Sequence, residues 1–169
     1  MTFLGLRFDK HLTFKNQIAH LKKSCNERLN VLKVLSHHSW YIDKPTMIQL
    51  YKSLVRSLLD YSLFIYPIIT NKNKRKLQYI QDSALRTILK KKFDYDKDLL
   101  HSETNIEKLE SRSLLLLSNY FSQGLANKNP LVENLVAEFE RFELTFKNNN
   151  IITLIDFIKN DQQINISIL

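Results

Sequence analysis

The sequence is poor in the residues that bend or cross-link a chain. Its 169 residues include only two Gly, three Pro and one Cys. So few Gly and Pro exclude collagen-like and linker-like chains, and they argue against a β-sandwich with many turns. A single Cys excludes an internal disulfide and any zinc site built from several cysteines.

Long apolar runs are also absent, since no stretch approaches the roughly 18 apolar residues that a membrane span needs. The longest, residues 58–69, is broken by Asp60. A secretory signal is not expected either, because charged residues interrupt the N-terminus at Arg7, Asp9 and Lys10. The sequence therefore predicts an intracellular protein that is not secreted and has no membrane partner.

Positive charge is concentrated in the first half of the chain. Residues 1–92 contain 18 Lys or Arg and five Asp or Glu, a net charge of +13. Residues 93–169 contain seven and 12, a net charge of −5. An AT-rich genome enriches lysine codons, but this bias does not explain the acidic second half. The asymmetry favours a polyanion as the partner of the first half.

Apolar residues recur at steps of three and four along most of the chain, which is typical of amphipathic helices. A buried Asp60 would need a partner, and Arg56 lies one helical turn before it. The expected helices cover residues 13–36, 44–66, 77–89, 106–125, 131–139 and a short 152–159, with a polar connector at 71–75 and an irregular segment at 93–103.

The first residues follow a different pattern. Alternating apolar residues at 2–8 predict a short strand, and Gly5 within it is typical of a bulge or a close backbone approach. One strand cannot pair with itself, so a partner strand must lie elsewhere or be missing, and a missing partner leaves an unpaired edge. The fold class predicted for the whole chain is all-α, a bundle of about five helices with this one N-terminal strand.

Three segments in this order resemble a known family. Residues 3–18 read FLGLRFDKHLTFKNQI, similar to (Y/F)LG(V/L)xxDxxLxWxxHI, with Phe14 in place of Trp. Residues 50–67 read LYKSLVRSLLDYSLFIYP, similar to LYxxLVxPxLxYxxxVW, with Ser57 in place of Pro. Residues 77–89 read LQYIQDSALRTIL, similar to LxxxQxxAxRxI. Together they resemble the end of the reverse transcriptase of non-LTR retrotransposons, of the jockey and LINE-like type.

The resemblance implies a division of the chain. In that family the FLG segment closes the palm subdomain, and the helices after it form the thumb, which lies against the template–primer duplex. Residues 1–12 would then be a palm-end strand, 13–140 a thumb-like helical bundle and 141–169 a C-terminal tail. The residues that correspond to the family's primer grip are Phe3, Leu4, Gly5 and Leu6.

The catalytic carboxylates of such a polymerase are not found in this sequence. They hold two divalent metals, and in the family two of them belong to an aromatic-x-Asp-Asp motif before the FLG segment. The sequence contains no Asp-Asp pair. We therefore expect no polymerisation by this chain alone, and no catalytic residue, metal site or cofactor in it. The full-length family would use Mg²⁺ at the palm site, and the chain resembles a fragment of a larger reading frame.

Basic side chains of the first half are the candidate nucleic-acid contacts, because phosphates reward any well-placed cation regardless of base sequence. The alternative is a solvated helix face made rich in lysine by base composition. The candidates form two clusters, Lys15, Lys22, Lys23 and Arg28 in the first helix and Lys72, Lys74, Arg75 and Lys76 before the third.

The sequence thus predicts a thumb fragment that binds an RNA–DNA hybrid or a DNA duplex without catalysis of its own, in the nucleus if the family role holds. Two alternatives stay open. One is a helical interaction module that associates with itself through the unpaired N-terminal strand. The other is a retrotransposon remnant without a function.

Overall fold

The structure, a computed structural model, describes residues 2–3, 5–11 and 13–143. Helices dominate this part of the chain, which confirms the predicted all-α fold class. None of the described helices is both long and apolar enough to cross a membrane. The chain divides into two compact units, Met1–Arg112 and Ser113–Leu169, and the predicted helix at 152–159 lies outside the described residues.

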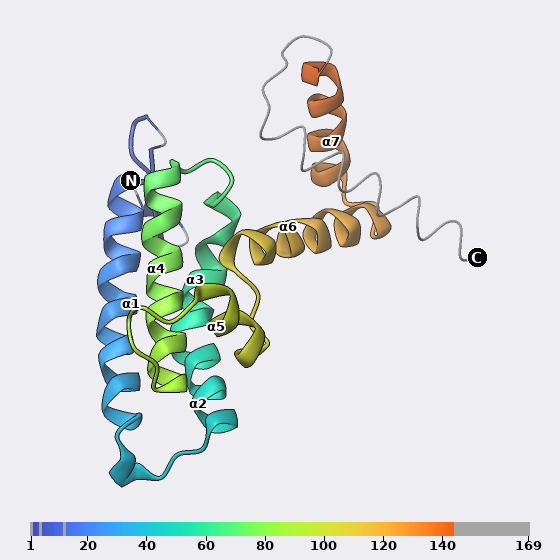
Figure 1. Ribbon diagram of the computed structural model, residues 1–169. Coiled ribbons are helices and arrows are strands. Elements are labelled where there is room, and N and C mark those ends of the chain that lie inside the picture. Colours follow the sequence, from blue (N-terminus) through green and yellow to red (C-terminus); the bar gives the residue numbers. More distant parts are fainter. Residues whose placement is uncertain (1, 4, 12, 144–169) are drawn as a thin grey trace, which may run out of the picture. The chain divides into compact units, whose positions relative to one another are not determined.

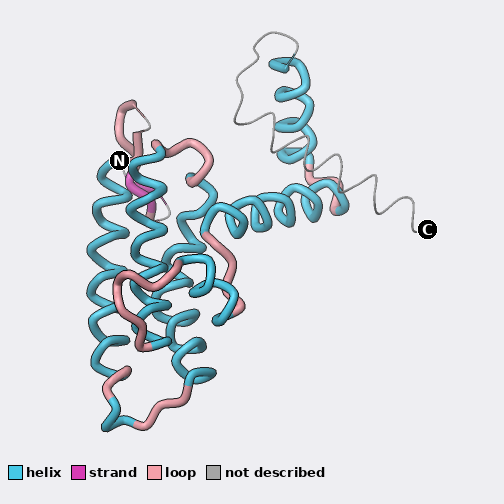
Figure 2. The backbone as a smooth tube through the Cα atoms, viewed as in Figure 1, coloured by secondary structure: helices cyan, strands magenta, loops and turns pink. Residues whose placement is uncertain are grey.

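The first unit is a bundle in which α1 (Lys15–Leu35) packs along α4 (Asn71–Leu89), as Figures 1 and 2 show. A third rod consists of consecutive helical segments that contact both. These are α2 (Lys44–Tyr51), the π-helical η2 (Lys52–Arg56), α3 (Ser57–Ser62) and the 3₁₀ turn η3 (Leu63–Ile65). A short 3₁₀ turn, η1 (His38–Trp40), and α5 (Lys97–Thr104) complete the unit before α6 begins.

The core lies between these three rods. The buried stripe of α1 has the predicted spacing of three and four, which confirms the predicted helix at 13–36 apart from its end residues. The buried apolar side chains of α1 are Ile18, Leu21, Cys25, Leu29 and Leu32, and Gln17 is buried beside them. The third rod contributes Tyr51, Val55, Leu59 and Leu63, and α4 contributes Leu77, Ile80, Ala84, Leu85 and Ile88.

The N-terminal segment is a hairpin, so the prediction of a single unpaired strand is wrong. Strand β1 (Thr2–Phe3) pairs antiparallel with β2 (Leu6–Arg7). Gly5 has a φ of +78°, a left-handed conformation that glycine adopts without steric cost. The glycine therefore forms the turn between two paired strands rather than a bulge within one strand.

Gln17 fixes the hairpin to the bundle. Its side-chain oxygen accepts a hydrogen bond from the backbone N–H of Arg7 at 3.0 Å, and its amide nitrogen donates to the Ser62 hydroxyl at 3.3 Å. The Phe8 ring packs edge-on against the buried Phe14 ring, with 5.6 Å between centroids. These contacts hold β2 beside the first turns of α1.

Several predicted boundaries are wrong. The predicted connector 71–75 is the first turn of α4, and α5 forms inside the segment predicted to be irregular. The first turn of α4 is polar, and α5 has apolar residues only at Leu99 and Leu100, so apolar periodicity reveals neither segment. The start of α5 is instead stabilised by a cap, since the Asp96 carboxylate accepts from the N–H groups of Asp98 and Leu99.

The second unit contains most of α6 (Leu109–Ala126) and α7 (Pro130–Glu143). The two helices meet where Gly124 faces the buried Val132. A Cβ atom at position 124 would lie only 2.6 Å from Val132 Cγ2. The missing side chain is therefore what lets α7 approach α6 at this point.

Gly124→Ala is expected to destabilise the α6–α7 unit by about 1–2 kcal/mol, because the stiff valine has no room to move away. In a Val132→Ala background the loss should be much smaller, because only the Cβ of residue 132 remains close, at 3.1 Å, and alanine gains up to about 1 kcal/mol of helix propensity over glycine. Hydrogen exchange of the α6 amides measures both changes. A loss of the same size in both backgrounds would show that the steric contact is not the cause.

Candidate nucleic-acid interface

The exposed surface of α1 carries three cations of the first predicted cluster. Lys15, Lys22 and Lys23 are all exposed. At 3.6 residues per turn, Lys15 and Lys22 are nearly aligned on one flank, with Lys23 about 100° further round on the outer face. Across the described part of the chain, none of the three forms an ion pair with a carboxylate. Their charges are available to a polyanion.

Arg28, the fourth member of that cluster, lies apart from the other three. It projects from the opposite flank of α1 and is half-buried. Its Nη1 donates to the backbone carbonyl of Leu54 at 3.0 Å. The structure therefore gives Arg28 a role in joining α1 to the third rod and does not bring it together with the lysines.

A groove of about 520 Å³ between the hairpin and α1 adds two basic residues that the sequence did not single out. Arg7 of β2 and His20 of α1 line it together with Lys23. His20 and Lys23 have the three-residue spacing of one helix face, which is a signal present in the sequence. Arg7 joins them only because the hairpin folds back onto α1.

Three of the four residues that resemble a primer grip belong to this hairpin. Phe3 lies in β1, Gly5 forms the turn and Leu6 is buried in β2, whereas Leu4 lies outside the described residues. Leu6 and Gly5 therefore shape the hairpin, and the adjacent Arg7 presents a charged group to the groove.

The second predicted cluster lies on the first two turns of α4. Lys72, Arg75 and Lys76 are exposed. Lys74 is half-buried, and its ammonium group lies 5.3 Å from the centre of the Tyr66 ring in a cation–π contact. This lysine is therefore partly engaged within the protein, whereas the other three are open to solvent.

Ion pairs gather in a different region. All those among the described residues join side chains between positions 56 and 112. The basic residues of the hairpin and of α1 take part in none. The net positive charge of the first half is thus an uncompensated surface charge, concentrated on the hairpin, α1 and the start of α4.

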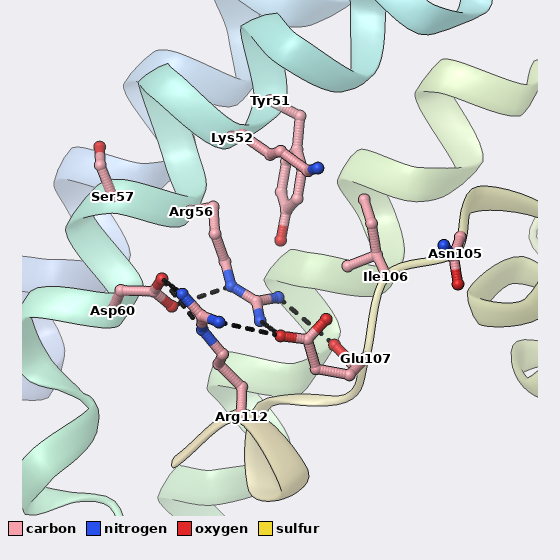
Figure 3. Close-up of a pocket in the computed structure, with 9 residues that line it drawn as sticks. All are labelled: Tyr51, Lys52, Arg56, Ser57, Asp60, Asn105, Ile106, Glu107 and Arg112. Atoms are coloured by element: carbon pink, nitrogen blue, oxygen red, sulfur yellow. Dashed lines mark hydrogen bonds and ion pairs between the residues drawn. The ribbon is translucent and has the colours of Figure 1, made fainter. Parts of the chain in front are cut away.

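A network of two arginines and two carboxylates surrounds a pocket of about 360 Å³ (Figure 3). Arg56 donates to Asp60 and to Glu107, each at 2.9 Å. Arg112 donates to the other oxygen of Asp60 at 2.8 Å and lies 3.4 Å from Glu107. The predicted pairing of Arg56 with Asp60 is confirmed. Every charge in this network has a partner. The network also joins the third rod to Glu107 in the connector before α6.

Burial raises the pKa of the Tyr51 hydroxyl beside this network, and the nearby Arg56 opposes the shift. The hydrogen bond with Asp60 raises the pKa of Arg112 above its ordinary value. Arg112 therefore stays charged across the whole physiological range.

A second buried network connects α4 to α5. His101 Nδ1 donates to the carbonyl of Ile106 at 2.7 Å, and Nε2 lies 3.3 Å from the Asp82 carboxylate. Gln78 donates to the same carboxylate at 2.7 Å. Burial pushes the pKa of Asp82 up, but the hydrogen bonds from His101 and Gln78 outweigh it, and the pKa lies below its ordinary value. Asp82 is therefore ionised and acts as an acceptor.

No protein-family model matches the chain, and no solved structure matches it significantly. One curated protein is similar, the "Probable RNA-directed DNA polymerase from transposon BS" of Drosophila melanogaster. The two are 24% identical over 118 residues, which cover 70% of this chain and 13% of that protein. This match supports a distant relation between the chain and a small part of a transposon's RNA-directed DNA polymerase.

Proposed function

We propose that this chain is a thumb-like fragment of an RNA-directed DNA polymerase from a non-LTR mobile element of the jockey type. Its role is to hold the template–primer duplex, an RNA–DNA hybrid or a DNA duplex, while the chemistry belongs to a palm subdomain. A nuclear location follows from such a role. The distant similarity to the transposon polymerase supports this proposal.

The observation that carries the proposal is that the basic residues without a carboxylate partner and those in ion pairs lie in different regions of the described structure. Arg7, Lys22 and Lys23 lie on the hairpin and α1 without a carboxylate partner among the described residues, whereas ion pairs are confined to positions 56–112. A cation paired within the protein gains little from a phosphate, but a free one releases counterions from a duplex. The hairpin–α1 face is therefore the side expected to contact the nucleic-acid backbone.

Binding through such a face should not depend on base sequence, because the contacts are to phosphates. It should weaken steeply with salt. Each phosphate contact adds about 0.9 to the slope of log affinity against log salt concentration for a duplex.

Lys22→Glu combined with Lys23→Glu is expected to weaken binding to an RNA–DNA hybrid equally for all sequences and to reduce the salt slope by about two. Fluorescence anisotropy of a labelled hybrid, titrated at several salt concentrations, measures both. The control is Lys44→Glu with Lys52→Glu, which reverses two exposed lysines on α2 and η2 and makes the same change in net charge.

An unchanged affinity after the reversal at 22 and 23, or an equal loss in the control, would contradict the proposed face. Light scattering measures the oligomeric state and so distinguishes the proposed function from the main alternative, a protein-interaction module. A dimer without affinity for the hybrid would support a protein-interaction module instead, although the strand once expected to mediate it is paired within the chain.

A further inference from the structure

A cavity of about 630 Å³ lies between α4 and the connector that leads into α5. Its volume falls within the roughly 300–1,000 Å³ typical of small-ligand sites. The wall from α4 carries Gln78, Asp82 and Arg86, one helical turn apart. The opposite wall comes from the connector and α5, and it includes Phe93, Asp94, Tyr95, Lys97 and His101.

Arg86 is unusual among the residues that line this cavity, because it is buried and, in the described part of the chain, lacks a hydrogen-bond partner at Nε. The residue is only 8% exposed, and its Nε is buried without a hydrogen-bond partner among the described residues. No described carboxylate pairs with its guanidinium, whose Cζ lies 5.3 Å from the centre of the Phe93 ring in a cation–π contact. Asp82, one turn earlier, is already engaged by Gln78 and His101. A buried and unpaired charge is costly, so its retention points to a ligand that completes it.

The remaining groups define the chemistry of that ligand. Phe93 is 74% exposed, which leaves an aromatic surface at the cavity mouth. Asp94 is exposed and takes part in no ion pair within the described ranges. The ligand should therefore be flat, accept hydrogen bonds from an arginine and donate hydrogen bonds to a carboxylate. A bare phosphate has no flat surface to stack on Phe93, and its negative charge would be repelled by the aspartates at 94, 96 and 98.

We propose that this cavity binds the guanine base of an unpaired nucleotide. Guanine offers two adjacent acceptors, N7 and O6, that match the two-pronged guanidinium of Arg86. Its N1–H and N2–H groups can donate hydrogen bonds to the Asp94 carboxylate, and its ring stacks on Phe93. Adenine presents a donor where guanine has O6 and cannot make the same pair with arginine.

This inference rests on the proposed nucleic-acid function, and it adds a base-reading site apart from the hairpin–α1 face. The source of the base is either a nucleotide left unpaired at the end of a bound hybrid or a free guanosine nucleotide. The same chemistry recognises both. Exposed Lys90 and Lys92 precede Phe93 in the chain and form no ion pair among the described residues, so the attached phosphates would meet free cations.

The test uses RNA–DNA hybrids that carry a single unpaired template nucleotide, guanine or adenine, with a blunt hybrid as reference. We expect the guanine overhang to bind about tenfold more tightly than the adenine overhang. Arg86→Met and Phe93→Ala should each reduce this ratio to about one and leave the blunt-hybrid affinity unchanged. Competition by guanosine monophosphate, with adenosine monophosphate as control, distinguishes the free nucleotide from the overhang.

Stability provides a second readout for Arg86→Met. If the arginine serves a ligand, its removal should leave the midpoint of denaturation unchanged or raise it, because an unpaired buried charge is lost. A fall of the midpoint would assign it a structural role and overturn the proposal, as would equal affinity for the two overhangs or a preference that survives in both variants. If no hybrid binds at all, the proposed function fails, and calorimetry with the two monophosphates then decides on the base site alone.

Discussion

Replacing Asp60 by alanine is expected to lower the free energy of unfolding by about 3 kcal/mol. The carboxylate accepts hydrogen bonds from both Arg56 and Arg112, and the Arg56 side chain is only 8% exposed. Without Asp60, the two guanidinium groups must share the Glu107 carboxylate. The buried Arg56 then keeps only one of its two carboxylate partners. Urea denaturation of the two proteins measures the loss.

Asp98→Ala is the matched control for this prediction. Asp98 also pairs with a cation, Lys108, at 2.6 Å, but both side chains of that pair are well exposed. Solvent screens such a pair, so its loss should change the midpoint only slightly. Equal losses from the two variants would show that the Arg56–Asp60–Glu107–Arg112 network is no more than a surface feature.

Leu32→Ala is expected to cost about 3 kcal/mol, the usual price of removing a fully buried leucine. The side chain is 0% exposed and lies on the inner stripe of α1. Val31→Ala, one position earlier on the same helix, removes a side chain that is 51% exposed. It should change stability by no more than about 0.5 kcal/mol. Denaturant unfolding of both variants gives the comparison.

This comparison also bears on the proposed interface. The hairpin–α1 face can meet a duplex only if the outer side of α1 is uncovered in the isolated protein. A large loss from Val31→Ala would mean that another surface covers α1, and the cations on that helix would then be less accessible than the structure shows.

Periodicity predicted much of the fold because most helices bury one regular stripe. Asp43 is the N-cap residue of α2 and Pro45 lies in its first turn, and both residue types are typical of a helix start. The sequence could not predict the turn at Gly5, because the pairing of β1 with β2 follows from backbone geometry rather than from apolar alternation. It also missed α5, whose ends depend on the Asp96 cap and on the contact of His101 with Asp82.

Only part of the candidate interface could be predicted from the sequence. Lys15, Lys22 and Lys23 follow from their positions outside the buried stripe of α1. Arg28 does not, since its bond to Leu54 depends on how α1 meets the third rod. Within the Arg56 network, Asp60 is one turn away, but Glu107 is 51 residues distant. Only the folded chain brings such partners together.

The π-helical η2 affects which side of the third rod faces the core along its length. Tyr51, Val55, Leu59 and Leu63 are spaced by four and are all buried. In a regular α-helix, each step of four advances about 40° around the axis, so Leu63 would have drifted well away from Tyr51. The wider π turn absorbs part of this drift. Deleting one residue from η2 would shorten the Tyr51–Leu59 spacing to seven residues, which is nearly two turns of a regular α-helix, so the downstream half of the rod would keep its buried side toward the core.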